Sequence, residues 1–223
     1  MSSIVLVILG LLVVLIGWEI WICEGAHLGR RFVVFLYELA AHRYDRIKGF
    51  DLEWEGRFLG EPIYAAISSL RDARLLDIGA GTGRLARALK PFPVVQRSLI
   101  CVEPSRRMLG LGRSLSPSGW VHWMRAWAVP LPFESATFDM VISLEIIEFT
   151  PSPRDSLAEM VRVLRPGGWL VVTNRVGWEA SLIFGKTFRR AQFPQLLESL
   201  GLGDVQVYPW QVDYDLAWAR KLF

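Results

Sequence analysis

The sequence of 223 residues contains few of the side chains that build metal cages and disulfide-bonded scaffolds. It has two cysteines, Cys23 and Cys101, and three histidines that are scattered along the chain. Two cysteines exclude a fold held together by several disulfides and a cysteine-based zinc cage. Because the histidines do not cluster in the sequence either, we predict no metal site.

The chain also lacks a large excess of charge of one sign. Its 25 basic residues nearly balance 22 acidic ones, so that the formal net charge is only +3. Proteins that bind nucleic acid usually carry a concentrated basic face, and we therefore predict no nucleic-acid partner. Hydrophobic residues make up 52% and charged residues 21% of the chain. This balance excludes both a disordered chain and a protein that crosses the membrane many times.

Much of the hydrophobic content lies at the start of the chain. The 17 residues from Ser2 to Trp18 carry no charge, and as a helix they span about 25 Å, or about 33 Å if the helix continues to Cys23. The hydrocarbon core of a bilayer is ~30 Å thick, so residues 1–23 predict a transmembrane anchor with the lipid bilayer as partner. A signal peptide and a buried or interfacial helix are the alternatives, but the run lacks the basic start and clear cleavage site of a signal peptide.

The basic residues around this run predict its orientation. Arg30 and Arg31 follow it closely, and no lysine or arginine precedes it. By the positive-inside rule, the chain is expected to be a single-pass membrane protein whose C-terminal domain lies in the cytoplasm.

The next segment, residues 24–61, is predicted to be a juxtamembrane helix followed by a linker. Phe32, Phe35, Leu36 and Leu39 recur at helical spacing between residues 28 and 47, which predicts an amphipathic helix. Its apolar stripe can lie on the membrane surface or pack on the main domain. Residues 48–60 are turn-rich and polar, and we interpret them as the linker.

From residue 62 onward, short apolar segments alternate with helical patterns. The predicted strands cover residues 74–78, 98–103, 121–126, 138–144, 169–173, 205–210 and 214–220. Repeated strand–helix alternation predicts the α/β fold class, with a doubly wound, mostly parallel seven-stranded sheet. Only a few residues separate the last two strands, so they are expected to form a C-terminal antiparallel hairpin.

A glycine-rich turn joins the first of these strands to the following helix. It reads Asp77-Ile78-Gly79-Ala80-Gly81-Thr82-Gly83, and glycines there allow positive φ and close approach of a ligand to the backbone. Doubly wound sheets bind nucleotides at this kind of switch point. Arg84 stands where the dinucleotide fingerprint needs glycine or alanine, and no Gly-Lys-Ser/Thr loop exists. The spacing therefore disfavours a nicotinamide-dependent oxidoreductase.

Residues 75–83 resemble motif I of the class I S-adenosylmethionine-dependent methyltransferases. Three later segments are also similar to motifs of that family and occur in its order: residues 102–105 (VEPS), 131–143 (LPF followed by FDMVIS) and 164–170 (LRPGGWL). The resemblance is closest to the members that act on small molecules such as quinones and lipids. It implies a Rossmann-like methyltransferase domain over residues 62–223 with S-adenosylmethionine as cofactor.

The resemblance also implies which residues bind the cofactor. Glu103 corresponds to the acidic residue that holds both ribose hydroxyls. Trp127 stands where the family commonly has an acidic residue near the adenine, and it can stack on the adenine or merely fill space. The expected cofactor-binding residues are Asp77, Gly79, Ala80, Gly81, Thr82, Gly83, Glu103, Pro104, Trp127, Ala128 and Ser143.

The catalytic residues stay open at this stage. Methyl transfer from a sulfonium mainly needs alignment and exclusion of water, and a base only where the acceptor loses a proton. Glu145 and Glu148 are candidates for that base, and each can equally be a structural carboxylate. Tyr44, within a segment that resembles the A-x-x-Y-D motif of quinone- and lipid-modifying members, can cover the pocket or pack on the domain.

The acceptor is predicted from one missing motif and from the anchor. Members that methylate nucleic-acid bases or glutamine carry N/D-P-P-Y/F after the fourth strand, whereas this chain has Ser143-Leu144-Glu145-Ile146. We therefore expect a membrane-anchored methyltransferase that acts on an apolar small molecule such as a quinone precursor or a lipid. The alternatives are an alkyl-thiol S-methyltransferase and a non-catalytic S-adenosylmethionine-binding membrane scaffold.

Overall fold

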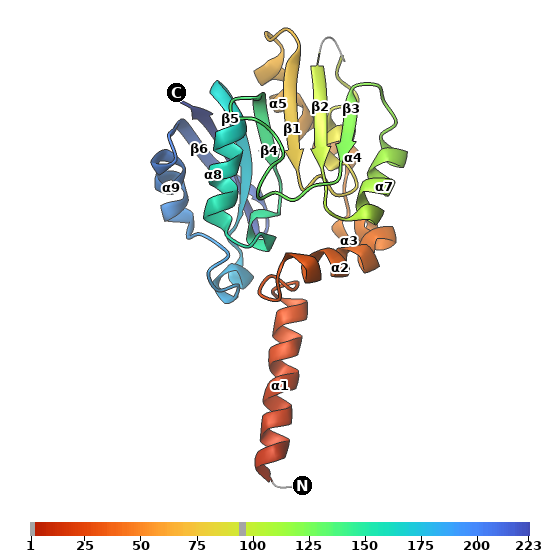
Figure 1. The fold of residues 1–223 in the computed structure, drawn as a ribbon, viewed down its shortest axis with the longest axis vertical. Helices are drawn as coiled ribbons and strands as arrows, with labels where there is room; N and C mark the ends of the chain where they lie inside the picture. The colour runs from red at the N-terminus through yellow and green to blue at the C-terminus, as the bar shows by residue number, and fades with distance from the viewer. Residues whose placement is uncertain (1–2, 94–96) are drawn as a thin grey trace.

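The computed structural model describes residues 3–93 and 97–223. Met1 and Ser2 of the predicted anchor lie outside the described residues. A twisted sheet with helices on both faces forms the body, and one long helix projects from it (Figure 1).

The sheet has seven strands in the order β3-β2-β1-β4-β5-β7-β6. Strands β1 to β5 are mutually parallel, and β7 is antiparallel to both of its neighbours. The predicted C-terminal hairpin is confirmed, with β7 inserted between β5 and β6. The strands are β1 (Ala73–Ile78), β2 (Arg97–Val102), β3 (Val121–Met124), β4 (Phe138–Ser143), β5 (Leu164–Arg175), β6 (Leu202–Gln211) and β7 (Tyr214–Lys221).

Helices cover the sheet on both sides, and this explains why its central strands are apolar throughout. Leu75 and Leu76 are neighbours in β1, yet they belong to two different core clusters on opposite faces of the sheet. Ser152 caps α8, accepting a hydrogen bond from the backbone N–H of Asp155 at 3.2 Å. The helices of the body are α5 (Glu61–Ile67), α6 (Arg84–Ala88), α7 (Arg106–Leu115), α8 (Pro153–Val163) and α9 (Phe193–Ser199), with 3₁₀ turns η3 (Ile147–Phe149), η4 (Trp178–Leu182) and η5 (Arg190–Gln192).

The segment between the long helix and the body differs from the prediction in two ways. The single helix expected over residues 28–47 ends at Ala40 and resumes at Tyr44. The prediction of a linker over residues 48–60 was wrong, because residues 52–60 are helical and pack into the core, with Leu59 fully buried. Its polar residues suggested exposure to solvent, but Glu55 is buried and paired with a buried arginine. The elements are α2 (Arg30–Ala40), η1 (Ala41–Arg43), α3 (Tyr44–Lys48), α4 (Leu52–Glu55) and the π turn η2 (Gly56–Gly60).

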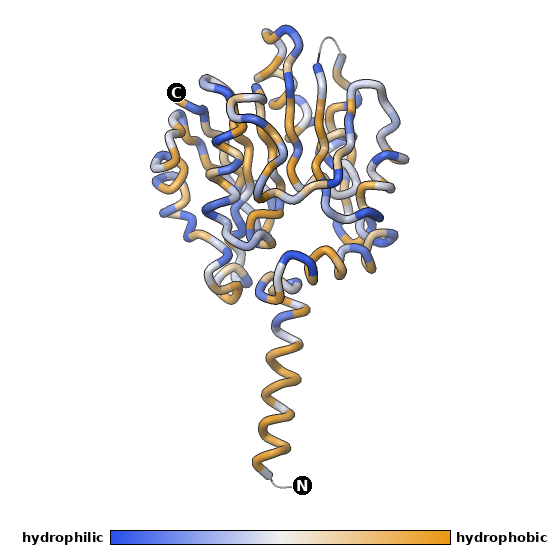
Figure 2. Tube along the Cα trace, in the orientation of Figure 1, coloured by the Kyte–Doolittle hydropathy of each residue, from blue (hydrophilic) through white to orange (hydrophobic). Residues whose placement is uncertain are grey.

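Helix α1 (Ser3–Trp21) is apolar over its whole projecting length, as Figure 2 shows. Its 19 residues correspond to roughly 28 Å, which is close to the thickness of a bilayer core. By length and composition α1 is able to cross a membrane, and only 6% of its most apolar window is buried. The C-terminal end of α1 is docked on the body, where Trp18 and Ile22 pack against Cys23, Ala26 and Ile183.

Candidate functional site

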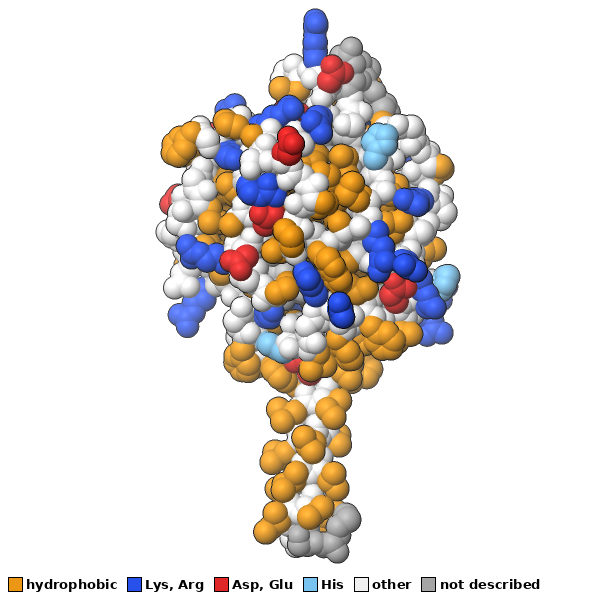
Figure 3. Space-filling view, in the orientation of Figure 1, with side chains coloured by type: hydrophobic (Ala, Val, Ile, Leu, Met, Phe, Trp, Pro, Cys, Tyr) orange, Lys and Arg blue, Asp and Glu red, His pale blue; other side chains and the backbone are white. Residues whose placement is uncertain are grey.

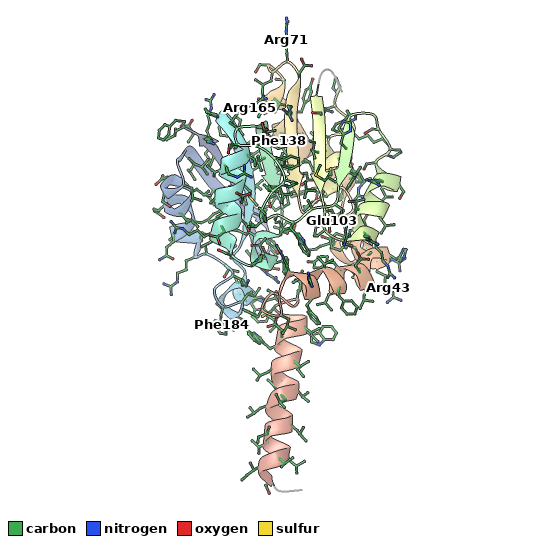
Figure 4. All side chains as sticks on the ribbon, in the orientation of Figure 1. Arg43, Arg71, Glu103, Phe138, Arg165 and Phe184 are labelled. Atoms are coloured by element: carbon green, nitrogen blue, oxygen red, sulfur yellow. The ribbon has the colours of Figure 1, made fainter. Side chains whose placement is uncertain are left out.

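A pocket lies at the carboxyl ends of β1, β2 and β4, between the sheet and α2. It contains about 790 Å³ of space, its open mouth included, which is a typical size for a small-molecule site. Figure 4 labels Glu103 at this end of the sheet, next to α2 and α3. The pocket is lined by Arg30, Val33, Val34, Tyr37, Tyr44, Gly79, Gly81, Val102, Glu103, Pro104, Met108, Ala126, Trp127, Ala128, Val129, Glu145, Ile146, Phe149, Thr150 and Pro151.

The glycine-rich loop forms one side of this pocket. Gly79 has a φ of +72°, and a Cβ there would lie 2.5 Å from Cγ2 of Ile146, so only glycine fits. The backbone N–H of Gly79 donates to the carbonyl of Val102 at 2.8 Å, and the N–H of Gly81 donates to Oε2 of Glu103 at 2.9 Å. These bonds attach the loop to the end of β2, so that its backbone faces the pocket at a defined position.

Two acidic residues end the neighbouring strands β1 and β2 without a cationic partner. Asp77 and Glu103 are both buried, and within residues 3–93 and 97–223 neither forms an ion pair. Burial raises the pKa of Asp77 to about 7, and the nearby charge of Glu103 adds to this effect. Burial also raises the pKa of Glu103 to about 7, although the N–H groups of Ser105 and Gly81 oppose the shift. Such a pair favours a ligand that brings a positive charge or hydrogen-bond donors.

The third acidic residue at this end of the sheet, Glu145, is already neutralised. Arg84 donates to Oε1 of Glu145 at 2.6 Å, and Lys48 donates to Oε2 at 2.7 Å. Arg84 also donates to Glu55 at 2.6 Å, so one buried guanidinium holds two carboxylates. Burial alone would raise the pKa of Glu145, but Lys48 and Arg84 hold it below its usual range. Each oxygen of Glu145 thus accepts a hydrogen bond from a cation, and Glu145 lines the pocket as a fixed anion.

Glu148 lies behind the pocket. It is fully buried, it is not among the pocket-lining residues, and its Oε1 accepts a hydrogen bond from the hydroxyl of Tyr214 at 2.6 Å. Burial raises the pKa of Glu148, which favours its neutral form. This contact ties η3 to the start of β7, so the geometry gives Glu148 a structural position.

The A-x-x-Y-D segment is attached to the glycine-rich loop. Tyr44 lines the pocket, and a Cβ on Gly81 would lie 3.8 Å from its ring. The hydroxyl of Thr82 donates to Asp45, and Asp45 also pairs with Arg87 at 3.1 Å. Burial raises the pKa of Tyr44 above its ordinary value, so its phenol stays protonated. Tyr44 therefore covers the loop from the side of α3.

The structure brings only some of the predicted site residues to the pocket surface. Gly79, Gly81, Glu103, Pro104, Trp127 and Ala128 line it, together with Tyr44 and Glu145. Asp77, Ala80, Thr82, Gly83 and Ser143 do not line it, although Asp77 lies at the end of β1 directly beneath the loop. The hydroxyl of Ser143 is buried without a hydrogen-bond partner. The cofactor roles of these residues stay predictions.

Sequence reasoning missed the wall that α2 contributes. Arg30, Val33, Val34 and Tyr37 line the pocket from this helix. The guanidinium of Arg30 lies 4.5 Å from the centre of the Trp127 ring and donates to the carbonyl of Val129 at 2.8 Å. The helical spacing of residues 28–47 predicted an amphipathic helix, but no local signal indicated that one of its faces closes a pocket.

Comparison with known proteins identifies similar proteins among the methyltransferases. Residues 76–172 match a family model described as "Methyltransferase domain". The chain is 31% identical over 125 residues to the O-methyltransferase cnsE of Penicillium expansum, covering 54% of this chain and 45% of that protein. It is 39% identical over 103 residues to the ubiquinone/menaquinone biosynthesis C-methyltransferase UbiE of Dinoroseobacter shibae, covering 44% and 41%. The chain thus spans about half the length, or less, of these relatives.

The fold is also similar to that of a solved structure over most of the chain. The cyclase SpnF superimposes with a TM-score of 0.71 at 18% identity, and the match covers 87% of this chain and 97% of that chain. At this level of identity the match supports the fold alone, because one fold hosts many chemistries.

Proposed function

The chain belongs to the class I S-adenosylmethionine-dependent methyltransferases, and we propose that it is a membrane-anchored member that methylates an apolar small molecule. One observation carries the proposal. A single pocket combines the glycine-rich loop and Glu103 on one side with an apolar wall from α2 on the other, and α2 directly follows α1.

The residues around the glycine-rich loop fit the cofactor. Glu103 has the position and the acceptor atoms for a ribose diol, and Asp77 offers a negative charge toward the cationic amino-acid end. Gly79 and Gly81 leave their backbone open to close approach. Trp127 presents an aromatic ring for the adenine. When bound, S-adenosylmethionine supplies a methyl group that is already activated as a sulfonium.

The remainder of the pocket suits an apolar acceptor. Val33, Val34, Ile146, Phe149 and Pro151 present almost no hydrogen-bonding groups, so they favour an apolar guest and exclude water from the transfer. Their task in the displacement is to align the acceptor with the methyl group. We propose quinone precursors and lipids as the acceptor class, and the name of the UbiE relative supports the quinone option.

The anchor part of the proposal rests on α1. Its length and apolar surface match a bilayer core, and Arg30 and Arg31 follow it in the sequence. We propose a single-pass protein with the methyltransferase domain in the cytoplasm. An acceptor that partitions into the bilayer would then be concentrated near the enzyme.

A second candidate function follows from the state of the acidic residues. Glu145 is held by two cations, and Glu148 is bonded to Tyr214 behind the pocket. Within the described residues the pocket therefore offers no unengaged base near the apolar wall. A thiol ionises on its own near pH 8.5, so an alkyl thiol needs little help from a base. Alkyl-thiol S-methylation is accordingly the alternative.

The test is a labelled-methyl screen with the full chain in lipid vesicles. S-adenosylmethionine carrying a labelled methyl group is supplied with a demethylated quinol, an alkyl thiol or a total lipid extract, and Asp77→Asn serves as the matched control. We expect label in the quinol or lipid fraction that depends on Asp77. Label in the thiol alone would support the alternative, and binding of S-adenosylmethionine without transfer to any fraction would leave the scaffold function. Resistance of the protein to alkaline carbonate extraction tests the anchor separately.

A further inference from the structure

Six large apolar side chains are exposed around the point where α1 meets the body. Their exposed fractions range from 53% to 84%. We propose that this basal patch docks the methyltransferase domain on the surface of a bilayer that contains anionic lipid, as a second membrane contact beyond α1. The inference rests on the proposed function in that it takes α1 to lie in the same membrane. The basal patch consists of Trp21, Leu28, Phe35, Leu39, Trp178 and Phe184.

The basal patch is continuous with the apolar surface of α1. The ring centres of Trp18 in α1 and Phe184 are 5.8 Å apart, and His27 contacts the backbone carbonyl of Phe184 at 3.0 Å. On the other side of α1, the turn at Gly25 packs directly against Phe32 of α2. Figure 4 labels Phe184 beside the upper end of α1, and Figure 3 shows apolar side chains gathered at the base of the body around that end. A membrane that contains α1 therefore reaches the patch.

Helix α2 has two apolar faces with different surroundings. Val33, Val34 and Tyr37 point to the pocket, whereas Phe35 and Leu39 are exposed on the outer side. In Figure 1, α2 lies across the axis of α1, so its outer face runs along the plane of a membrane that α1 crosses. An amphipathic helix in this orientation places its apolar side chains at the boundary between headgroups and acyl chains.

The charges around the patch fit an anionic surface. Every exposed residue between His27 and Ile47 is apolar, glycine, histidine or arginine, and none is acidic. The two acidic residues of α2 and α3 are only partly exposed and are held by contacts to the body, since Glu38 accepts from the backbone N–H of Arg106 and Asp45 pairs with Arg87. The exposed basic residues are Arg31, Arg43 and Arg46. Arginines beside an apolar helix face attract anionic headgroups, and this selects a phospholipid bilayer over a neutral protein partner.

The docking has a consequence for the acceptor. Because α2 separates the basal patch from the pocket, a docked domain brings the pocket wall to the boundary between lipid and water. An acceptor dissolved in the bilayer then reaches the pocket past α2 without crossing bulk water. Arg30, bonded to Val129, and Glu38, bonded to Arg106, are the contacts that hold α2 over the pocket during this step.

Depth-dependent fluorescence quenching tests the docking. A Phe35→Cys variant of the full chain is labelled with an environment-sensitive fluorophore, which is selective because Cys23 and Cys101 are both buried. The protein is placed in phosphatidylcholine vesicles with about one-third phosphatidylglycerol and a shallow spin-labelled lipid. Leu70→Cys, adjacent to Arg71 at the opposite end of the body in Figure 4, is the matched control.

We expect quenching at position 35 to be at least about threefold stronger than at position 70, and to fall when phosphatidylglycerol is omitted. Equal quenching at both positions, in protein that resists carbonate extraction, would overturn the docking while leaving the anchor intact. A protein that carbonate extracts would instead contradict the anchor. Methyl transfer is not needed for this measurement, so failure of the proposed activity is distinguishable from failure of the patch.

A functional arm uses the double variant Phe35→Asp/Leu39→Asp against Leu70→Asp. Because these side chains lie outside the pocket, binding of S-adenosylmethionine is expected to stay unchanged in calorimetry. Transfer to a membrane-dissolved acceptor is expected to drop at least about tenfold in the double variant, while transfer to a short-chain, water-soluble homologue persists. Equal loss with both acceptors would mean a general defect and would contradict the docking.

Discussion

Two pairs of buried acidic residues lie at the same end of the sheet and differ in the side chains that contact them. Asp77 and Glu103 end β1 and β2, form no ion pair within the described residues, and have pKa values raised to about 7 by burial. Glu145 and Glu148 follow β4. Arg84 and Lys48 hold both oxygens of Glu145, and the hydroxyl of Tyr214 donates to Oε1 of Glu148, whose Oε2 has no partner within the described residues.

We interpret this difference as one between carboxylates available to a ligand and carboxylates that belong to the framework. A buried carboxylate without a partner is costly, and a bound cation or a hydrogen-bonding diol removes that cost. A buried carboxylate with its partners in place is part of the framework and has little capacity left for a substrate proton. We therefore propose cofactor binding for Asp77 and Glu103, and a structural role for Glu145 and Glu148.

The largest effect is expected when the cation that holds Glu145 is removed. Arg84→Met leaves Glu55 and Glu145 buried without their shared guanidinium, and we expect a loss of about 3–5 kcal/mol in the free energy of unfolding. Thermal or denaturant unfolding of the full chain in mild detergent measures it. Arg154→Met on the exposed side of α8 is the control, with an expected change below about 0.5 kcal/mol. A similar loss of unfolding free energy in both variants would contradict a structural role for the pairing of Arg84 with Glu55 and Glu145.

The next test removes the charge of Asp77, a carboxylate that forms no ion pair within the described residues. Asp77→Asn keeps the size of the side chain but not its charge, and we expect affinity for S-adenosylmethionine to fall about 10- to 100-fold, as for a lost charge-assisted hydrogen bond. Calorimetry on the full chain measures the change. Glu148→Gln preserves an acceptor for Tyr214 and is expected to leave the affinity within about twofold. If Glu148→Gln weakened binding as much as Asp77→Asn, the two pairs would not differ in the way described.

The pKa values predict a pH dependence with a defined sign. Ionised Asp77 and Glu103 favour the cationic cofactor, so we expect affinity for S-adenosylmethionine to decrease as the pH falls below 7, by up to about tenfold per pH unit for each group. In the unliganded protein the folded pKa values exceed the unfolded ones near 4, so the folded state binds more protons. Its stability therefore decreases as the pH rises from about 4 to 7. Calorimetry and unfolding between pH 5 and 8 check both trends, and a flat binding profile would contradict them.

The smallest effect is expected for Glu145, which lines the pocket but is held by two cations. Because cations hold the pKa of Glu145 below its usual range, Glu145→Gln is predicted to lower kcat less than about tenfold and to leave the shape of the pH–rate profile unchanged. A loss of about a hundredfold or more, together with disappearance of the fall in rate at low pH, would identify Glu145 as a general base.

Local patterns predicted a large part of this molecule. The glycine-rich turn and the apolar strands each depend on neighbouring residues, and the structure has them where the sequence indicated. Residues 48–60 were misread as a linker because burial of Glu55 depends on Arg84, which lies 29 positions away. The pocket wall from α2 was missed for a similar reason, since a helical stripe shows amphipathicity but not what each face meets.

The sequence by itself determined the fold class, the family, the place of the nucleotide-type loop and the apolar character of α1, because spacing and composition carry these properties. Only the tertiary structure decided which acidic residues pair with a cation. Glu145 meets Lys48 and Arg84 from 97 and 61 positions away, whereas Asp77 and Glu103 form no ion pair within the part of the chain that the structure describes. Charge compensation in a buried site acts over a few ångströms in space, and the folded chain alone sets which side chains come that close.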